Sequence, residues 1–401
     1  MLLPPPALRC PSFPAAPAPA APTAETTGGT FVITFVPLTG FLGAGKTTTM
    51  IATAQALQEQ GRRVAVITND QGVELVDTAL VRSKLDSVAE VTGGCFCCRF
   101  EDLVDTIRAL VDGAGDTPVD TVIAEAVGSC TDLQATVVRP LRAYYGDSMV
   151  VSPLTTVIDP LRYLAFDRAA QRGEPESDLS YLFRQQLTEA DVIAVNKLDT
   201  IAPDRASELM GRLTADYPNA AVVGYSAKSG DRVDELVKAW DGPSGNQAVD
   251  LQVDYDRYAA AEAQLAWMNQ DVQLTSEAPL DLTAWGRQVL ATLGSWADCA
   301  GAVVGHAKLT VEASDGDFAK LSLTAAGAEP TVDRAAEKPA TTARVIVNAR
   351  VACEPADLDA AVRDAVATAN AATGARSAAT APVSFKPGYP TPVHRLAATG
   401  A

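Results

Sequence analysis

The first half of the chain alternates short apolar runs with stretches in which apolar residues recur at helical spacing. This alternation is typical of a parallel sheet covered by helices. We expect strands at 30–36, 62–68, 86–91, 119–125, 149–159, 190–196 and 220–226. We expect helices at 46–60, 101–112, 131–144, 179–189, 203–216 and 231–240, and a polar loop at 171–178. The pattern predicts an α/β fold with a mostly parallel, doubly wound sheet.

The pattern changes after the turn-rich segment DGPSGNQ at 241–247, which we interpret as a boundary between domains. Beyond it we expect helices at 281–297 and 354–372, strands at 303–313, 318–324 and 342–352, and a loop at 325–341. From about residue 375 the sequence indicates loose structure. We therefore predict a larger α/β domain at 29–242 and a smaller α+β domain with an antiparallel sheet at 243–401.

Composition narrows the class of protein. The chain has 401 residues, 47% of them hydrophobic, and a formal net charge of −17, which disfavours nucleic acid and anionic membranes as partners. It contains no apolar run of about 18 residues that would span a bilayer. Residues 1–28 are rich in proline and alanine and predict a disordered tail, so we leave them out of the fold. Seven cysteines, three of them clustered, do not resemble a secreted disulfide framework and favour a reducing cytoplasm.

The first predicted strand runs into GFLGAGKT at 40–47, which has the spacing of a phosphate-binding loop between a strand and a helix. Its glycines let backbone amides wrap phosphates, Lys46 would bridge the β- and γ-phosphates, and the Thr47 hydroxyl would bind Mg²⁺. The helix that starts at Lys46 adds its positive N-terminal end. The alternative, a glycine-rich turn with a chance lysine, fits this context poorly. The predicted loop residues are Gly40, Gly43, Ala44, Gly45, Lys46, Thr47 and Thr48.

The segment NKLD at 196–199 indicates which base is bound. The Asp199 carboxylate can accept two hydrogen bonds from the guanine N1–H and exocyclic amine, whereas adenine offers no such pair of donors. Asn196 would hold the loops at the base edge, and the stem of Lys197 would lie along the ring. SAK, comprising Ser226, Ala227 and Lys228, ends the next predicted strand at the same edge of the sheet. Together these residues favour GTP, although an NKxD sequence alone is usually a solvated turn.

Acidic residues at neighbouring strand ends are candidates for catalysis. Glu125 ends its predicted strand and would hold Mg²⁺ through water or position the attacking water. Its alternative role is to cap the following helix. Asp70 and Asp77 lie in TNDQGVELVD, where a switch loop would follow the second strand, and both could equally be ordinary loop acids. No arginine is evident as a catalytic finger, so we expect slow intrinsic turnover.

The segment GGCFCC at 93–98 places three cysteines at the same sheet edge. Thiolates suit Zn²⁺ and also bind Co²⁺, so Cys95, Cys97 and Cys98 form a candidate metal site with an open coordination position. Inert buried cysteines and a vicinal disulfide are the alternatives. Cys130 could reach the same neighbourhood, but we interpret it as a core residue.

These motifs, in this order, resemble those of the CobW-like metallochaperone GTPases, P-loop proteins related to nickel-enzyme maturation GTPases. The resemblance rests on GFLGAGKTT, ND, GGCFCC, ExxG and NKLD and covers about residues 30–241. It implies GTP hydrolysis with Mg²⁺, coupled to delivery of Zn²⁺, Co²⁺ or Fe²⁺ to a client metalloprotein or metal-cofactor enzyme. It also implies a nucleotide-dependent homodimer.

The chain departs from this family in three ways. Asp70 stands where many members have glutamate, the strand end reads EAVGSC, and the only histidines are His306 and His394, so a histidine-rich metal store is absent. Two alternatives therefore stay open beside the metallochaperone. One is a GTPase activator that remodels a metalloenzyme client and whose cysteines are structural, and the other is a non-catalytic metal or nucleotide sensor.

Overall fold

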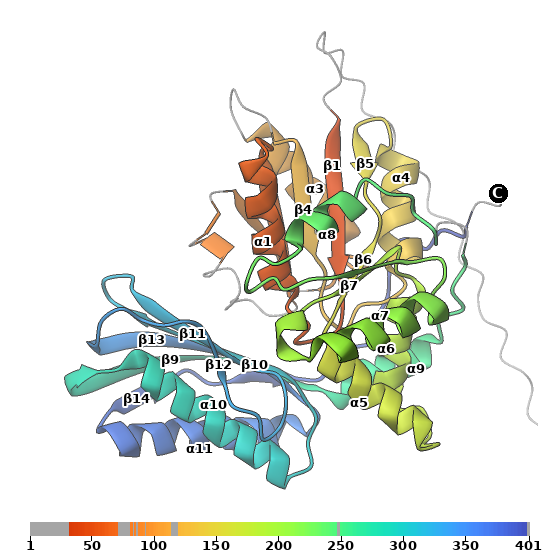
Figure 1. The fold of residues 1–401 in the computed structure, drawn as a ribbon. Coiled ribbons are helices and arrows are strands. Elements are labelled where there is room, and N and C mark those ends of the chain that lie inside the picture. Colours follow the sequence, from red (N-terminus) through yellow and green to blue (C-terminus); the bar gives the residue numbers. More distant parts are fainter. Residues whose placement is uncertain are drawn as a thin grey trace, which may run out of the picture. The chain divides into compact units, whose positions relative to one another are not determined.

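The computed structural model describes residues 32–70, 81–82, 84–85, 87–92, 94–113, 119–246 and 249–398. Within these residues, eight strands form a parallel sheet in the order β3-β2-β4-β1-β6-β7-β8, with β5 paired to β1 (Figure 1). The strands are β1 (Ile33–Thr39), β2 (Val64–Asp70), β3 (Val88–Thr92), β4 (Thr121–Glu125), β5 (Met149–Val151), β6 (Thr155–Ile158), β7 (Val192–Val195) and β8 (Ala221–Gly224). This sheet confirms the predicted fold class.

Helices follow most of these strands. They are α1 (Lys46–Glu59), α3 (Phe100–Asp112), a π-helix (Gln134–Val138), α4 (Arg139–Tyr145), α5 (Pro160–Gln171), α6 (Asp178–Thr188), a 3₁₀ turn (Leu198–Thr200), α7 (Pro203–Asp216), α8 (Val233–Ala239) and α9 (Tyr255–Gln264). Apolar side chains from both faces of the sheet pack against them in two buried clusters. Because all the strands run in parallel, their carboxyl ends meet at one edge, where ligands bind in doubly wound folds.

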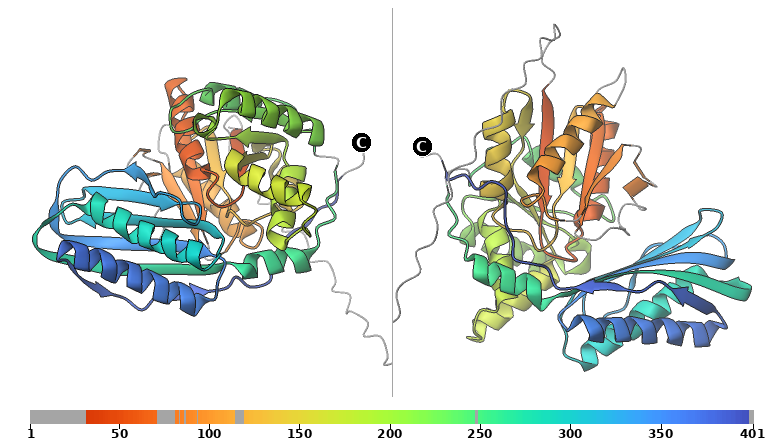
Figure 2. Two further views of the ribbon diagram at one scale, coloured as in Figure 1. Left: turned by 60° about the horizontal axis from the view of Figure 1, so that its bottom comes forward. Right: turned by 180° about the vertical axis from the view of Figure 1, so that it is seen from behind.

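A second, antiparallel sheet has the order β12-β11-β10-β13-β9-β14, with β15 also paired to β9. Its elements are β9 (Ala266–Leu280), α10 (Leu282–Cys299), β10 (Val304–Ala313), β11 (Phe318–Leu323), β12 (Thr331–Arg334), β13 (Ala340–Val351), α11 (Pro355–Thr373), β14 (Arg376–Ala379) and β15 (Val383–Phe385). Helices α10 and α11 lie side by side on one face, over an apolar core (Figures 1 and 2). The opposite face of β10 and β11 carries the polar side chains of His306, Lys308, Thr310 and Lys320. This confirms the predicted α+β character of the C-terminal half.

Several elements differ from the prediction. The apolar stretch 149–159 is interrupted at residues 152–154 and forms two short strands, and the stretch 131–144 begins as a π-helix. Helix α5 was not predicted, although Asp159 accepts a hydrogen bond of 2.8 Å from the Leu161 backbone N–H and Pro160 occupies the first helical position. Helix α9 and strand β9 were also missed, because both are rich in polar and alanine residues.

The predicted loop at 325–341 contains β12, and the segment after residue 375 is more ordered than predicted, since β14 and β15 both pair with β9. Short strands dominated by small and polar residues carry a weak sequence signal because the partner strand supplies most of their stability. In the described part of the chain, none of the helices combines the length and hydrophobicity needed to cross a membrane.

Candidate functional site

The phosphate loop connects β1 to α1, as its sequence predicts. Gly40, Gly43 and Gly45 have φ values of 134°, 79° and 91°, in the region that favours glycine. A Cβ on Gly40 would lie 2.0 Å from the Val157 carbonyl oxygen, and one on Gly45 would lie 2.5 Å from Nδ2 of Asn196. Larger residues are therefore excluded at both positions by the backbone conformation and by the neighbouring strands.

Lys46 and Thr47 begin α1 and are both buried. The Lys46 ammonium donates a hydrogen bond of 2.8 Å to the Gly40 carbonyl oxygen, so it lies across the mouth of the loop. The Thr47 hydroxyl donates to the Glu125 carboxylate over 3.1 Å, which brings together the two oxygens predicted to serve Mg²⁺. Glu125 comes from the end of β4, which pairs with β1.

The predicted base-binding residues lie beside this loop. Asn196 donates from Nδ2 to the Ala44 carbonyl oxygen over 3.0 Å and accepts from the Ala227 backbone N–H over 3.0 Å. Lys197 donates to the Gly43 carbonyl oxygen over 2.7 Å and pairs with Asp159 over 2.8 Å. The Ser226 hydroxyl donates to Asp199 over 2.7 Å, which orients that carboxylate. The three segments are therefore joined by direct hydrogen bonds.

One cavity of about 390 Å³ runs along this edge. Most of the predicted nucleotide-binding residues line it: Gly43, Gly45, Lys46, Thr47, Thr48, Glu125, Asn196, Lys197, Asp199, Ser226 and Lys228. Gly40, Ala44 and Ala227 are not part of the lining; they contribute backbone carbonyl or amide groups to their neighbours. Asp70 ends β2, but its side chain lies outside the described part of the chain, as does Asp77.

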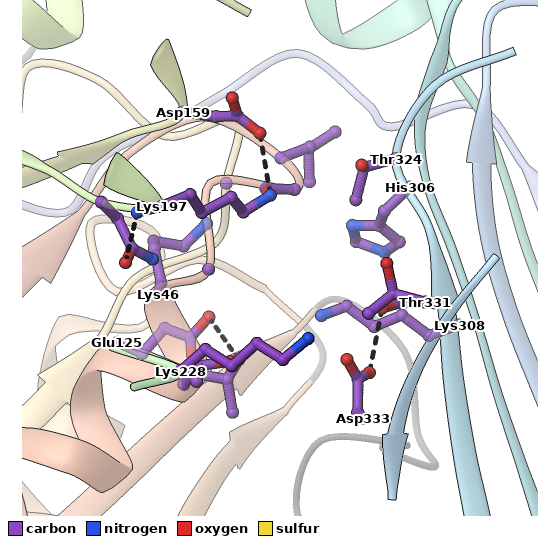
Figure 3. Close-up of a pocket in the computed structure, with 18 of the residues that line it drawn as sticks. Lys46, Glu125, Asp159, Lys197, Lys228, His306, Lys308, Thr324, Thr331 and Asp333 are labelled. Carbon is purple, nitrogen blue, oxygen red and sulfur yellow. Dashed lines mark hydrogen bonds and ion pairs between the residues drawn. The ribbon is translucent and has the colours of Figure 1, made fainter. Parts of the chain in front are cut away.

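The opposite wall of the cavity was not predicted. It comes from the polar face of the second sheet and includes His306, Lys308, Lys320 and Arg350. Figure 3 shows Lys228 and Lys308 pointing toward one another from the two walls. The alternation of polar and apolar residues in HAKLTVEA indicates a polar face, but it does not say what that face meets. His306 is thus a buried pocket residue, and neither histidine belongs to a metal-ligand cluster within the described residues.

The guanidinium of Arg162 in α5 joins the second sheet to the phosphate loop. It donates hydrogen bonds to the backbone carbonyl oxygens of Val304 and Thr324, over 2.9 and 2.7 Å, and lies over the Phe41 ring. Burial lowers the pKa of Arg162, but the carbonyl acceptors and the nearby charge of Asp159 favour its cationic form.

The three predicted metal ligands lie together. The Sγ–Sγ distances are 2.9 Å for Cys95–Cys97, 3.4 Å for Cys95–Cys98 and 3.8 Å for Cys97–Cys98. A tetrahedral Zn²⁺ site with Zn–S bonds of about 2.3 Å has sulfur–sulfur edges of roughly 3.8 Å, so small shifts would fit this trio to zinc. Cys95 and Cys97 are buried and Cys98 is half-buried, so Cys98 forms the accessible side of the cluster.

Cys130, predicted to be a core residue, is buried and also contacts this cluster through its thiol. Hydrogen bonds from the thiols of Cys130, Cys97 and Cys98 lower the pKa of Cys95 well below its usual value. The pKa of Cys97 is raised by its hydrogen bonds with Cys130, Cys95 and Cys98, and burial raises the pKa of Cys130. Cys95 is therefore the thiol of this cluster that loses its proton most readily, and a bound metal ion would displace protons from its neighbours as well.

A match to a family model covers most of the first half of the chain. The model is that of the CobW/HypB/UreG nucleotide-binding domain and matches residues 34–223. This segment belongs to the CobW/HypB/UreG family. The match confirms the predicted resemblance for the part of the chain that contains the phosphate loop, the cysteine trio and NKLD.

Curated relatives match over about half of their length. A zinc chaperone CobW from Pseudomonas aeruginosa is 29% identical over 219 residues, covering 48% of this chain and 56% of that protein. A zinc chaperone CobW from a Sinorhizobium species is 31% identical over 188 residues, covering 41% and 50%. Among solved structures, the zinc-bound YjiA GTPase from E. coli aligns over 83% of this chain and 98% of that chain at 17% identity. The TM-score of this alignment is 0.36.

Proposed function

We propose that this protein is a GTP-hydrolysing metallochaperone that binds a transition metal through Cys95, Cys97 and Cys98 and delivers it to a client metalloprotein. Zinc is the cargo that the names of the curated relatives suggest. The observation that carries the proposal is the closeness of the two sites. The Asn69 side chain lines the nucleotide cavity and donates a hydrogen bond of 2.7 Å to the carbonyl oxygen of Gly94, the residue before Cys95.

The residues at the phosphate loop fit a Mg²⁺·GTP complex. Hydroxyl and carboxylate oxygens from Thr47 and Glu125 are the hard ligands that Mg²⁺ prefers, and Lys46 neutralises phosphate charge. The ion would supply charge neutralisation between the β- and γ-phosphates. Glu125 would hold the ion or a water molecule, and Asp70 is proposed to act at the same edge. Asp199 and Asn196 would recognise guanine.

The test measures both ligands and the effect of each on the other. We expect phosphate release from GTP above the level of Lys46→Ala, and binding of Zn²⁺ whose affinity changes when a slowly hydrolysed GTP analogue is present. Thermodynamic linkage makes this effect reciprocal. Zn²⁺ must therefore change the affinity of the protein for the analogue by the same factor by which the analogue changes its affinity for Zn²⁺. Cys97→Ser should weaken zinc binding while leaving nucleotide affinity within about twofold, because the thiol lies outside the nucleotide cavity. Identical zinc titrations with and without the analogue would reject the coupling.

Burial of the thiols favours a second candidate, a GTPase activator with structural cysteines. Cys95 and Cys97 are 4% and 2% exposed, and free cysteine packs well as a small apolar residue. In that case a triple Cys→Ser variant would still activate its client. For the metallochaperone, the same variant should lose client loading while it still hydrolyses GTP. The proposal includes a client metalloprotein, dimerisation on GTP binding and a location in the reducing cytoplasm. Cross-linking of the GTP-bound protein inside cells would identify the client and the dimer.

A further inference from the structure

Asn69 connects the nucleotide cavity to the cysteine loop. It is the next-to-last residue of β2, lines the cavity and is 8% exposed. Its side-chain nitrogen donates to the carbonyl oxygen of Val91 over 2.9 Å and to that of Gly94 over 2.7 Å. Val91 lies near the end of β3, beside Asn69 in the strand pairing, and Gly94 directly precedes Cys95. One side chain therefore reaches from the cavity wall to the residue that precedes the first cysteine of the trio.

The orientation of this amide is fixed by its partners. Both partners of the nitrogen are carbonyl oxygens, which only accept hydrogen bonds. If the amide nitrogen and oxygen were exchanged, the amide oxygen would face these two carbonyl oxygens without any donor between them. The remaining atom, Oδ1, is buried and has no hydrogen-bond partner among the described residues. A buried acceptor left unpaired is destabilising, so Oδ1 is expected to acquire a partner in the working protein.

The chemistry of Oδ1 limits what that partner is. A carbonyl oxygen accepts only, and phosphate oxygens also accept, so a phosphate group would be repelled. The partner must be a cation or a donor such as a metal-bound water. Thr47 and Glu125 line the same cavity as Asn69, and hydroxyl, carboxylate and amide oxygens are the kinds of ligand that suit hydrated Mg²⁺.

We propose that Asn69 is a positioning residue that couples Mg²⁺·GTP to the cysteine loop. Its Oδ1 binds Mg²⁺ or a water on that ion, while its Nδ2 holds the carbonyl groups of Val91 and Gly94. When the nucleotide complex binds, the side chain is drawn to the ion and the Gly94 carbonyl follows, which changes the position of Cys95. The inference rests on the proposed function and adds the residue through which one ligand affects the other.

Two substitutions separate the two ends of the side chain. Asn69→Asp keeps an oxygen for the ion but loses both N–H donors, so Gly94 is released. Asn69→Ala removes both ends. Asn219→Ala, in an exposed turn, is the matched control. Thermal unfolding of each variant shows whether it folds, and Asn69→Ala carries the test alone if the carboxylate beside two carbonyl groups prevents folding.

Two measurements are made on the full chain. The first is the Mg²⁺ concentration that supports half-maximal binding of a fluorescent, slowly hydrolysed GTP analogue. The second is the ratio of Co²⁺ affinities with and without the Mg²⁺·analogue complex, read from the thiolate-to-cobalt absorption with Mg²⁺ in large excess. We expect Asn69→Ala to need about tenfold more Mg²⁺, as the loss of one ion contact predicts, and to bring the ratio within about twofold of one. Asn69→Asp should need no more Mg²⁺ than the wild type for binding of the analogue. Its ratio of Co²⁺ affinities should nevertheless fall to about one, because the link to Gly94 is lost.

The outcomes are distinguishable. Wild-type values of both quantities in Asn69→Ala would overturn the inference. A wild-type protein that binds the analogue but shows a ratio of one would overturn the link to Gly94, and the Mg²⁺ requirement of Asn69→Ala would then decide the link to the ion. Failure of the wild-type protein to bind the analogue or Co²⁺ at all would instead reject the proposed function.

Discussion

The backbone N–H of Val393 donates a hydrogen bond of 2.9 Å to the carbonyl oxygen of Cys97. The segment around Val393 runs from β15 back along the first half of the chain (Figure 2). His394 packs edge-on against Phe100 with ring centroids 4.9 Å apart, and Arg395 pairs with Asp132 over 2.7 Å. The C-terminal segment therefore lies beside the cysteine loop and covers part of it.

We predict that Val393→Pro, which removes this donor, makes the cysteine loop more reactive. Proline has no N–H, so the Cys97 carbonyl loses its partner and the covering segment loosens. The rate at which a disulfide reagent modifies the thiols of the metal-free protein should rise at least about threefold. Ala397→Pro is the control, since no hydrogen bond from the Ala397 N–H is found in the described part of the chain. Equal rates for both variants and the wild type would show that the segment does not protect the loop.

Lys308 should contribute to nucleotide affinity from the second sheet. It faces Lys228 across the cavity, and two ammonium groups facing each other favour an anion between them (Figure 3). Lys308→Gln is expected to weaken GTP binding about tenfold, the usual scale of one charge-assisted hydrogen bond, with a smaller loss for guanosine. The comparison is Lys338→Gln, an exposed position away from the cavity, measured by isothermal calorimetry. A loss of equal size for guanosine and GTP would rule out a phosphate contact.

Asp199→Asn should change the preferred base. The new amide would face two donors on guanine, whereas xanthine presents an oxygen at the same position and can accept from it. We expect GTP affinity to fall at least about tenfold, in line with a cost of about 1–3 kcal/mol for mismatched donors, and XTP to bind more tightly than GTP. Competition between the two nucleotides for the same site measures the ratio. An unchanged ratio would contradict the assignment of Asp199 to the base.

The sequence predicted the parallel sheet because its buried strands are continuous apolar runs with motifs at their carboxyl ends. The phosphate loop, NKLD and SAK could each be located, and the sheet topology explains why they meet. Strand β9 could not be found, because its polar and apolar positions are set by strands on both sides and by β15. Helix α5, by contrast, has a capping signal in its sequence, because Asp159 and Pro160 stand at its start.

The candidate site was predictable only on the side of the first sheet. Lys308 and Lys320 lie in strands whose alternation indicates a polar face, but contacts between distant segments decide that this face meets the phosphate loop. The same limit applies to Cys130, whose spacing from Glu125 does not reveal that its thiol reaches Cys95. Asn69 was visible only as part of a family motif, and its two hydrogen bonds to β3 and Gly94 required the structure.

Stability should fall as the pH rises through the range in which buried Glu189 ionises. Burial raises the pKa of this carboxyl to about 8, with the charge of Asp132 adding to the effect. Since the folded pKa lies above the unfolded one, the stabilisation from the bound proton is complete below about pH 4.5 and is lost progressively up to about pH 8. The slope for one proton is roughly 1.4 kcal/mol per pH unit at 25 °C.

Glu189→Gln should flatten this slope, because the amide can donate to the Thr131 hydroxyl and accept from the Gln134 N–H without titrating. Chemical unfolding at several pH values between about 5 and about 8, within the range over which this stabilisation is lost, gives the free energy of unfolding directly. A residual slope is expected from Glu262, whose pKa burial also raises to about 8. Parallel curves for variant and wild type would exclude Glu189 as the titrating group.

The core of the parallel sheet includes Tyr258 and Ala261 from α9, Leu265 directly after it and Trp267 from β9, all of which follow the eight strands of that sheet in sequence. Deleting everything after residue 242 would remove these side chains and open the first core to water. A soluble minimal GTP-binding fragment should therefore not be obtainable by simple C-terminal shortening. Engineers who wish to exchange the second sheet for that of a relative would have to retain α9 and the start of β9 and make the crossover within the strand.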